Sequence, residues 1–444
     1  MDRPGRAHRY FAGMRCQQAA LAFVVLGLLS SSCRKDKDEQ APTIQFLSPV
    51  SGVNVVIPDT ITVSVEVSDN EEVTNVTFSV VNAQGFPVSS SISVEPGTNP
   101  ATITVQLPLT SDLILSGDHE VKVVASDGTN RTTSARSITV SGLPRRLRGI
   151  YLLTQPASDQ VSVQWIDSAG VLGTVTNVGQ DLNCSAVSSH GQRIFLGGGT
   201  VGPLTALHPD GSVQAQLAGS NTLSIPFFTA LHVGPTGSVF VATNDGQLRR
   251  LNKDLGGTGY QAQAVAGHRI LQIVERTDQV LTAQSAIASA EERLVSYSSI
   301  GGVQTDVWML DKVPVALFER DADHVLLFGN RNGGGVVEDR NTSDGGFWEP
   351  RTFPDPIEDV AQVSSNIYIL ATGSELIRFT YNNAGALTIA SGNTFEHLAY
   401  NEVSGELIAT DGTEVFVLDP ASGTVLNTYT LPGEPQRPLV LYNR

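Results

Sequence analysis

Cysteine is scarce in this sequence, with 3 among 444 residues, at positions 16, 33 and 184. So sparse a set excludes a disulfide framework, and the fold must therefore be held together by a packed core. Cys184 lies in an apolar strand pattern, which indicates a small core residue and not a nucleophile. A chain of this length is too long for one compact core, so two or more domains are expected.

Helical periodicity is also missing, because no stretch sustains apolar residues at helical spacing, whereas glycine is frequent at 42 residues. Basic residues are few: 28 Lys and Arg face 44 Asp and Glu, for a formal net charge of −16. Nucleic acids and anionic membrane surfaces repel such a chain, so neither is predicted as a partner. The histidines make no local metal-ligand pair, and the usual hydrolase signatures are absent. We predict no metal, no cofactor and no catalytic residue.

Long hydrophobic runs are absent as well. The longest, Ala19 to Ser30, follows four arginines and is about a dozen residues long, too short to span a bilayer of roughly 30 Å. A basic segment followed by a short apolar one is typical of a signal peptide, which we place at residues 1–32. Cleavage near Ser32 by an ordinary signal peptidase is one interpretation of its end.

The residues around Cys33 favour a second interpretation. Leu29-Ser-Ser-Ser-Cys33 resembles a bacterial lipoprotein processing site, which implies that Cys33 becomes the N-terminus and carries acyl chains such as palmitate. Residues 33–40 continue as a short charged tether that is not expected to fold. The tether resembles the export signals of surface lipoproteins in the Bacteroidetes group, which implies an anchor in the outer membrane.

Residues 41–142 alternate apolar and polar side chains in short runs, as in Ile61-Thr-Val-Ser-Val-Glu-Val67 and Ile103-Thr-Val-Gln-Leu107. Strict alternation predicts half-buried strands, and several such runs predict a β-sandwich. With Val67-Ser-Asp-Asn70 and Ala125-Ser-Asp-Gly128, the segment resembles bacterial immunoglobulin-like (Ig-like) domains. Carboxylates suit calcium, so Asp69, Glu71 and Glu72 form either a calcium site or a solvated acidic turn.

After a short basic linker at residues 143–148, a weak repeat recurs seven times over residues 149–444. Its second predicted strands begin 40 to 45 residues apart, near Ile150, Ile194, Val239, Val280, Val325, Ile367 and Leu407. This spacing is typical of four-stranded propeller blades. The last apolar run, within residues 438–444, lacks a second strand after it, and the first repeat lacks a strand before it. We therefore predict an all-β chain: an Ig-like sandwich followed by a seven-bladed propeller that the C-terminal strand closes.

The propeller resembles the quinoprotein-like and YncE-like group in architecture only, because family motifs are missing. Predicted innermost strands begin near His268 and His397, and Asp181, Asp359 and Arg437 occupy similar places. Of these, His268, Asp359, His397 and Arg437 are our candidate binding residues at one mouth of the central channel.

The favoured function is non-catalytic: an outer-membrane lipoprotein, exposed at the surface, that binds a protein or a glycan. Two alternatives stay open. One is a carbohydrate-active enzyme, a lyase or glycosidase, which needs carboxylates or histidines converging at the channel mouth. The other is a periplasm-facing scaffold for outer-membrane protein assembly.

Overall fold

The computed structural model describes residues 38–200, 202–220 and 225–444. The predicted signal peptide, Cys33 and most of the charged tether lie outside these residues. The described chain is almost entirely β, with one 3-10 helix, η1 (Tyr381–Asn383). Among the described residues, no helix has the length and apolar character needed to cross a membrane. The chain divides into two compact units, residues 1–143 and 144–444.

The first unit is a β-sandwich of eight strands in two sheets, ordered β1-β3-β6 and β2-β8-β7-β4-β5. Side chains alternate between core and solvent along β3 and β6, as the sequence predicted, so Val63, Val65 and Leu107 are fully buried. Burying one such side chain contributes about 1.5–3 kcal/mol. The strands are β1 (Thr43–Ser48), β2 (Val53–Val56), β3 (Asp59–Ser68), β4 (Asn75–Asn82), β5 (Ile92–Val94), β6 (Ala101–Leu109), β7 (Gly117–Ser126) and β8 (Arg131–Ser141).

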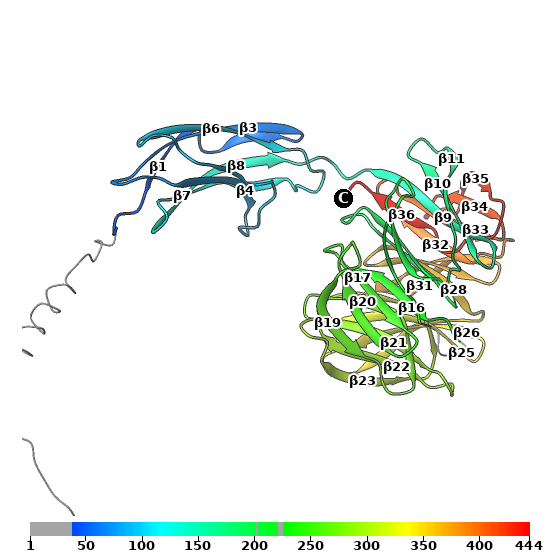
Figure 1. Cartoon of the computed structure of the whole chain (residues 1–444). Helices are drawn as coiled ribbons and strands as arrows, with labels where there is room; N and C mark the ends of the chain where they lie inside the picture. Colours follow the sequence, from blue (N-terminus) through cyan, green and yellow to red (C-terminus); the bar gives the residue numbers. More distant parts are fainter. Residues whose placement is uncertain (1–37, 201, 221–224) are drawn as a thin grey trace, which may run out of the picture. The chain divides into compact units, whose positions relative to one another are not determined.

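The second unit is a propeller of seven four-stranded antiparallel sheets, which confirms the predicted fold class (Figure 1). Blade 1 combines β36 (Leu439–Tyr442), β9 (Leu147–Ala157), β10 (Gln160–Asp167) and β11 (Leu172–Val178). Blade 2 contains β12 (Cys184–Ser188), β13 (Arg193–Gly197), β14 (Leu204–Leu207) and β15 (Val213–Leu217). Blade 3 contains β16 (Phe228–Val233), β17 (Val239–Thr243), β18 (Gln247–Leu251) and β19 (Gly257–Gln263).

Blades 4 to 7 repeat this order from an innermost to an outermost strand. Blade 4 contains β20 (His268–Glu275), β21 (Gln279–Ala286), β22 (Glu292–Ser298) and β23 (Gln304–Leu310). Blade 5 contains β24 (Val313–Glu319), β25 (His324–Arg331), β26 (Gly334–Asn341) and β27 (Phe347–Phe353). Blade 6 contains β28 (Ile357–Ser364), β29 (Ile367–Thr372), β30 (Glu375–Thr380) and β31 (Gly385–Ser391). Blade 7 contains β32 (His397–Asn401), β33 (Glu406–Asp411), β34 (Glu414–Leu418) and β35 (Val425–Thr430).

Each blade buries both of its faces against its neighbours, which is why its inner strands read as continuous apolar runs. In β9, Tyr151 and Leu153 pack against blade 2, while Ile150 and Leu152 pack with Ile408 of blade 7. Both faces of blade 1 are therefore covered only when blade 7 lies beside it.

The C-terminal strand completes blade 1 by pairing antiparallel with β9, from Leu439 opposite Tyr151 to Tyr442 opposite Leu147. It also contacts the innermost strands of blades 2 and 7, β12 and β32. Asn443 exchanges two hydrogen bonds with the Arg146 backbone, in which Arg146 N donates to Asn443 Oδ1 at 2.9 Å and Asn443 N donates to Arg146 O at 3.1 Å. The first and last segments of the propeller are thus joined by hydrogen bonds.

We predict that deleting residues 438–444 unfolds the propeller. The deletion removes the buried Leu439, Leu441 and Tyr442 and uncovers the edge of β9. Each large core side chain lost costs about 2–5 kcal/mol, comparable with much of the roughly 5–15 kcal/mol that stabilises a domain. Calorimetry should show the propeller transition lost and the sandwich transition kept. Removal of Arg444 alone, which leaves β36 whole, is the control, and a seven-residue truncation that melts like the full chain would contradict the assignment.

Candidate functional site

The innermost strands of the blades all begin on one face of the propeller, which we call the loop face. It carries the connections between successive blades and the turns between second and third strands. A cavity of about 940 Å³ opens there, where blades 6, 7 and 1 meet, and we call it the loop-face cavity. Its walls are Gln155, Pro156, Glu358, Gly373, Thr394, Phe395, Glu396, His397, Thr413, Pro432, Gly433, Glu434, Pro435 and Gln436.

Four ionisable side chains line this cavity: Glu358, Glu396, His397 and Glu434. Glu358 and Glu434 are exposed, and Glu396 and His397 are half-buried. Within the described ranges, none of the four side chains has a hydrogen-bond or ion-pair partner. The described residues that line the cavity include no lysine or arginine. The polar atoms of the four ionisable side chains are therefore available to a bound molecule.

Asp359 and Arg437 lie beside the cavity and form an ion pair with each other. Arg437 Nη2 lies 2.9 Å from Asp359 Oδ1 and also donates to Val360 O. Asp359 is 7% exposed, and its Oδ2 accepts the Leu398 amide at 2.8 Å. This group joins blade 6, blade 7 and the segment that precedes β36. Of the candidate residues, these two serve as a connection between blades, and His397 lines the cavity.

A β-bulge explains why Glu358 and not Asp359 faces the cavity. The register of β28 against β29 shifts between Ile357 and Asp359, so Glu358 has no partner in the ladder. Bulges re-aim side chains in this way, often beside functional sites. Sequence reasoning missed the three glutamates. The available signal was that Glu358 and Glu396 directly precede the candidate residues Asp359 and His397.

His268 lies elsewhere, buried at the start of β20 in blade 4. Its Nδ1 is 3.1 Å from Ala266 O, and its Nε2 is 3.7 Å from Glu291 Oε1. The same carboxylate oxygen accepts Arg293 Nε at 2.5 Å. The structure therefore does not bring His268 to the loop-face cavity.

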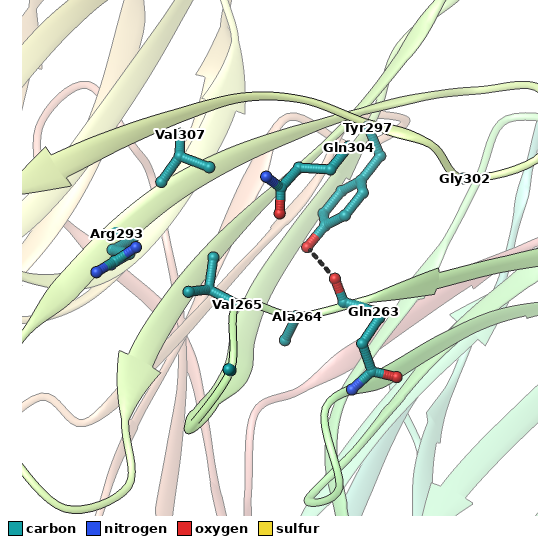
Figure 2. Close-up of a pocket in the computed structure, with 9 residues that line it drawn as sticks. Gln263, Ala264, Val265, Arg293, Tyr297, Gly302, Gln304 and Val307 are labelled. Atoms are coloured by element: carbon teal, nitrogen blue, oxygen red, sulfur yellow. Dashed lines mark hydrogen bonds between the residues drawn. The ribbon is translucent and has the colours of Figure 1, made fainter.

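Next to this cluster lies a second cavity of about 520 Å³, shown in Figure 2. Arg293 and Tyr297 project into it from β22, and the Tyr297 hydroxyl donates to Gln263 O at 2.9 Å. Burial raises the pKa of Tyr297, so it stays protonated. Its other walls are Ala264, Val265, Ala266, Gly302, Gln304 and Val307. Arg293 is already engaged by Glu291, so this cavity offers amides and apolar surface but no free charge.

The remaining residues that the sequence singled out have structural roles. Asp181 accepts hydrogen bonds from Thr200 and Gly202 and so holds its own loop. Cys184 packs among apolar side chains of blades 2 and 3, and burial raises the pKa of its thiol to about 12. A thiol held protonated is a poor nucleophile, in agreement with the core role expected from the sequence.

Among the described residues, two groups of carboxylates have oxygens within 4.8 Å of one another. In the sandwich, Asp69 meets Asp38 and Asp127, while the predicted companions Glu71 and Glu72 do not belong to the group. In blade 5, the group of Asp311, Glu338 and Glu349 surrounds an ammonium, because Lys312 Nζ lies 2.5–3.0 Å from all three.

Comparison with protein-family models gives a match within the first unit. Residues 42–140 match the family model of the bacterial Ig domain. A search of curated proteins gave no match. Among solved structures, a quinonprotein alcohol dehydrogenase-like protein from Bacteroides thetaiotaomicron VPI-5482 is 13% identical, with 90% of this chain and 99% of that chain covered and a TM-score of 0.46. Dihydro-heme d1 dehydrogenase NirN in complex with DHE is also 13% identical, with coverages of 67% and 77% and a TM-score of 0.44. The propeller assignment rests on the strand pairing of this chain itself.

Proposed function

We propose that this chain is a lipid-anchored outer-membrane protein whose propeller binds a protein or a glycan at the loop-face cavity without turning it over. The observation that supports the proposal is the set of four unpaired ionisable side chains, Glu358, Glu396, His397 and Glu434, in one cavity of about 940 Å³. Recognition residues usually lie on loops held by a rigid scaffold, and three blades supply the loops here.

A carbohydrate-active enzyme is the second candidate, because three glutamates and a histidine line the same cavity. Glycoside hydrolysis needs one carboxylic acid with a raised pKa and a second carboxylate at a fixed distance. Glu358 and Glu434 are exposed, so water and not protein surrounds these two carboxylates. No described residue orients any of the three glutamates by a hydrogen bond. These two features favour binding over catalysis.

The lipid anchor rests on the sequence alone, on the short apolar run, the serines before Cys33 and the charged tether. The tether favours the cell surface in a Bacteroidetes type of envelope. A periplasm-facing scaffold for outer-membrane protein assembly is the alternative orientation. Proteolysis of intact cells distinguishes the two, because only a surface-exposed chain is cleaved before the outer membrane is opened.

We predict that the variant E358Q/E396Q/E434Q binds its ligand at the loop face at least tenfold more weakly than the wild type. Neither protein is expected to release product. The substitutions keep the size of the side chains, replace one acceptor oxygen of each with an amide donor and remove three negative charges. Binding is measured by retardation in native gels that contain polysaccharides, and turnover by product release from the same polysaccharides and from chromogenic glycosides. The control variant E66Q/E95Q/E120Q removes three charges from exposed positions of the sandwich. Product formation by the wild type that E396Q abolishes would establish the enzyme instead.

We also predict that Cys33→Ala releases the protein from the membrane fraction. Two or more acyl chains hold a protein firmly on a membrane, and none can be attached without the thiol. Membrane and soluble fractions are compared by immunoblot after a high-salt wash. Cys184→Ala serves as the matched control and should stay with the membrane. Retention of the Cys33 variant in washed membranes would place the anchor elsewhere.

A further inference from the structure

Two neighbouring aromatic side chains are exposed on the outermost strand of blade 5. Phe347 is 55% and Trp348 52% exposed, and the described part of the propeller exposes no other aromatic side chain to this extent. Successive residues of a strand face opposite sides, so Trp348 faces blade 6 and Phe347 faces away from it. Tryptophan is enriched at interaction surfaces, because one ring buries a large apolar area and can also donate a hydrogen bond.

Trp348 is held in place by a buried carboxylate. Its Nε1 donates to Asp339 Oδ2 at 3.2 Å, and Asp339 is 1% exposed. The hydroxyl of Tyr381, from η1 in blade 6, donates to the same oxygen, so one carboxylate anchors aromatic rings from two blades. The two rings lie 6.2 Å apart at 62°. We call Trp348, Tyr381, Asp339 and Arg320 the rim site.

Arg320 completes this arrangement. It forms an ion pair with Asp339, donates to the Tyr381 hydroxyl at 2.7 Å and lies 4.9 Å from the centre of the Tyr381 ring. The position that a cationic ligand would take over this ring is therefore filled by the protein's own guanidinium, which argues against an amine ligand. Asp339 Oδ1 is buried and accepts no hydrogen bond from the described residues, so one acceptor stays unused.

The edge of β27 is protected against pairing with another strand. Pro350 lies in its middle and has no amide to donate, the charged Glu349 and Arg351 flank it, and the ladder with β26 is irregular between Val337 and Asp339. Proline, charge and bulges are the features that block strand addition. A partner at this edge must therefore contact side chains and not the backbone.

We propose that the rim site binds carbohydrate, with the apolar C–H face of a sugar ring on the Trp348 indole and the sugar hydroxyls toward Tyr381 and Arg320, which the buried Asp339 holds in place. A wholly apolar partner would remove water from the partly exposed Arg320 guanidinium without offering a hydrogen bond in its place, which is costly. A molecule with one apolar face and a rim of hydroxyls fits both the exposed ring and the charges beside it. The rim site is separate from the loop-face cavity, and this proposal does not depend on the function assigned there.

The test uses the full chain and four probes: cellohexaose, chitohexaose, mannohexaose and polygalacturonate. Binding is followed by calorimetry and by tryptophan emission, since Trp348 is the only one of the three tryptophans that is largely exposed. We expect at least one probe to bind and to shift this emission. Trp348→Ala should weaken that binding at least tenfold, and Trp348→Phe, which keeps a ring, by less. Phe347→Ala is the matched control and should bind as the wild type does.

Melting temperatures of the variants establish that they are folded, and Tyr381→Phe, which removes only the hydroxyl, provides a second variant should Trp348→Ala not fold. The proposal is overturned if none of the four probes binds, if Trp348→Ala binds as the wild type does, or if Phe347→Ala loses binding equally. Self-association that depends on Trp348, without binding of any probe, would assign the rim to a protein contact instead. Loss of binding in E358Q/E396Q/E434Q with full binding in Trp348→Ala would place the glycan at the loop face and would also overturn the rim site.

Discussion

The pairing of β36 with β9 is the interaction on which the propeller depends. Every blade buries both faces against its neighbours, so an open ring would leave two large apolar surfaces in water, one on blade 1 and one on blade 7. The pairing draws the strand at the C-terminal end to the first strand of the unit and covers both surfaces at once. Arg145 reinforces it, because its guanidinium lies 4.1 Å from the centre of the Tyr442 ring.

The loop-face cavity exists only because of this closure. Its walls combine Gln155 of blade 1 with Glu396 of blade 7 and with residues 432–436, which lead into β36. The ion pair between Arg437 and Asp359 then fixes that segment against blade 6. The stability of the ring and the shape of the cavity therefore depend on the same few residues. Substitution of Asp359 or Arg437 should therefore change the shape of the cavity, because this ion pair holds the segment against blade 6.

The architecture was readable from the sequence because two periods determine it. Alternation of polar and apolar residues located the strands of the sandwich, and the 40- to 45-residue repeat located the blades: six of the seven predicted second strands begin within one residue of the observed start, and the seventh, predicted at Ile150, begins at Leu147. Both signals are local or periodic, and both follow from which faces are buried.

The chemistry of the sites was not readable in the same way. His397 lines the loop-face cavity, and its role as a binding residue stays a prediction. The bulge at Glu358 turns this residue and not Asp359 toward the cavity, and no sequence pattern reveals a bulge. The network of buried charges in blade 5 could not be predicted from the sequence for a different reason. Glu338, Asp339 and Arg340 look like a solvated run of charges, yet all three are buried, because Lys312 and Arg320 reach them from β24 and its flanking turns. Such pairings require contacts between strands that the sequence separates.

The two sites differ in what a ligand must supply. At the loop-face cavity no described residue holds the glutamates by a hydrogen bond, so a ligand bound there would have to order them, and the electrostatic part of its affinity would weaken as salt screens their charge. At the rim, hydrogen bonds to Asp339 already fix Trp348 and Tyr381, so little entropy is left to lose and salt has less effect.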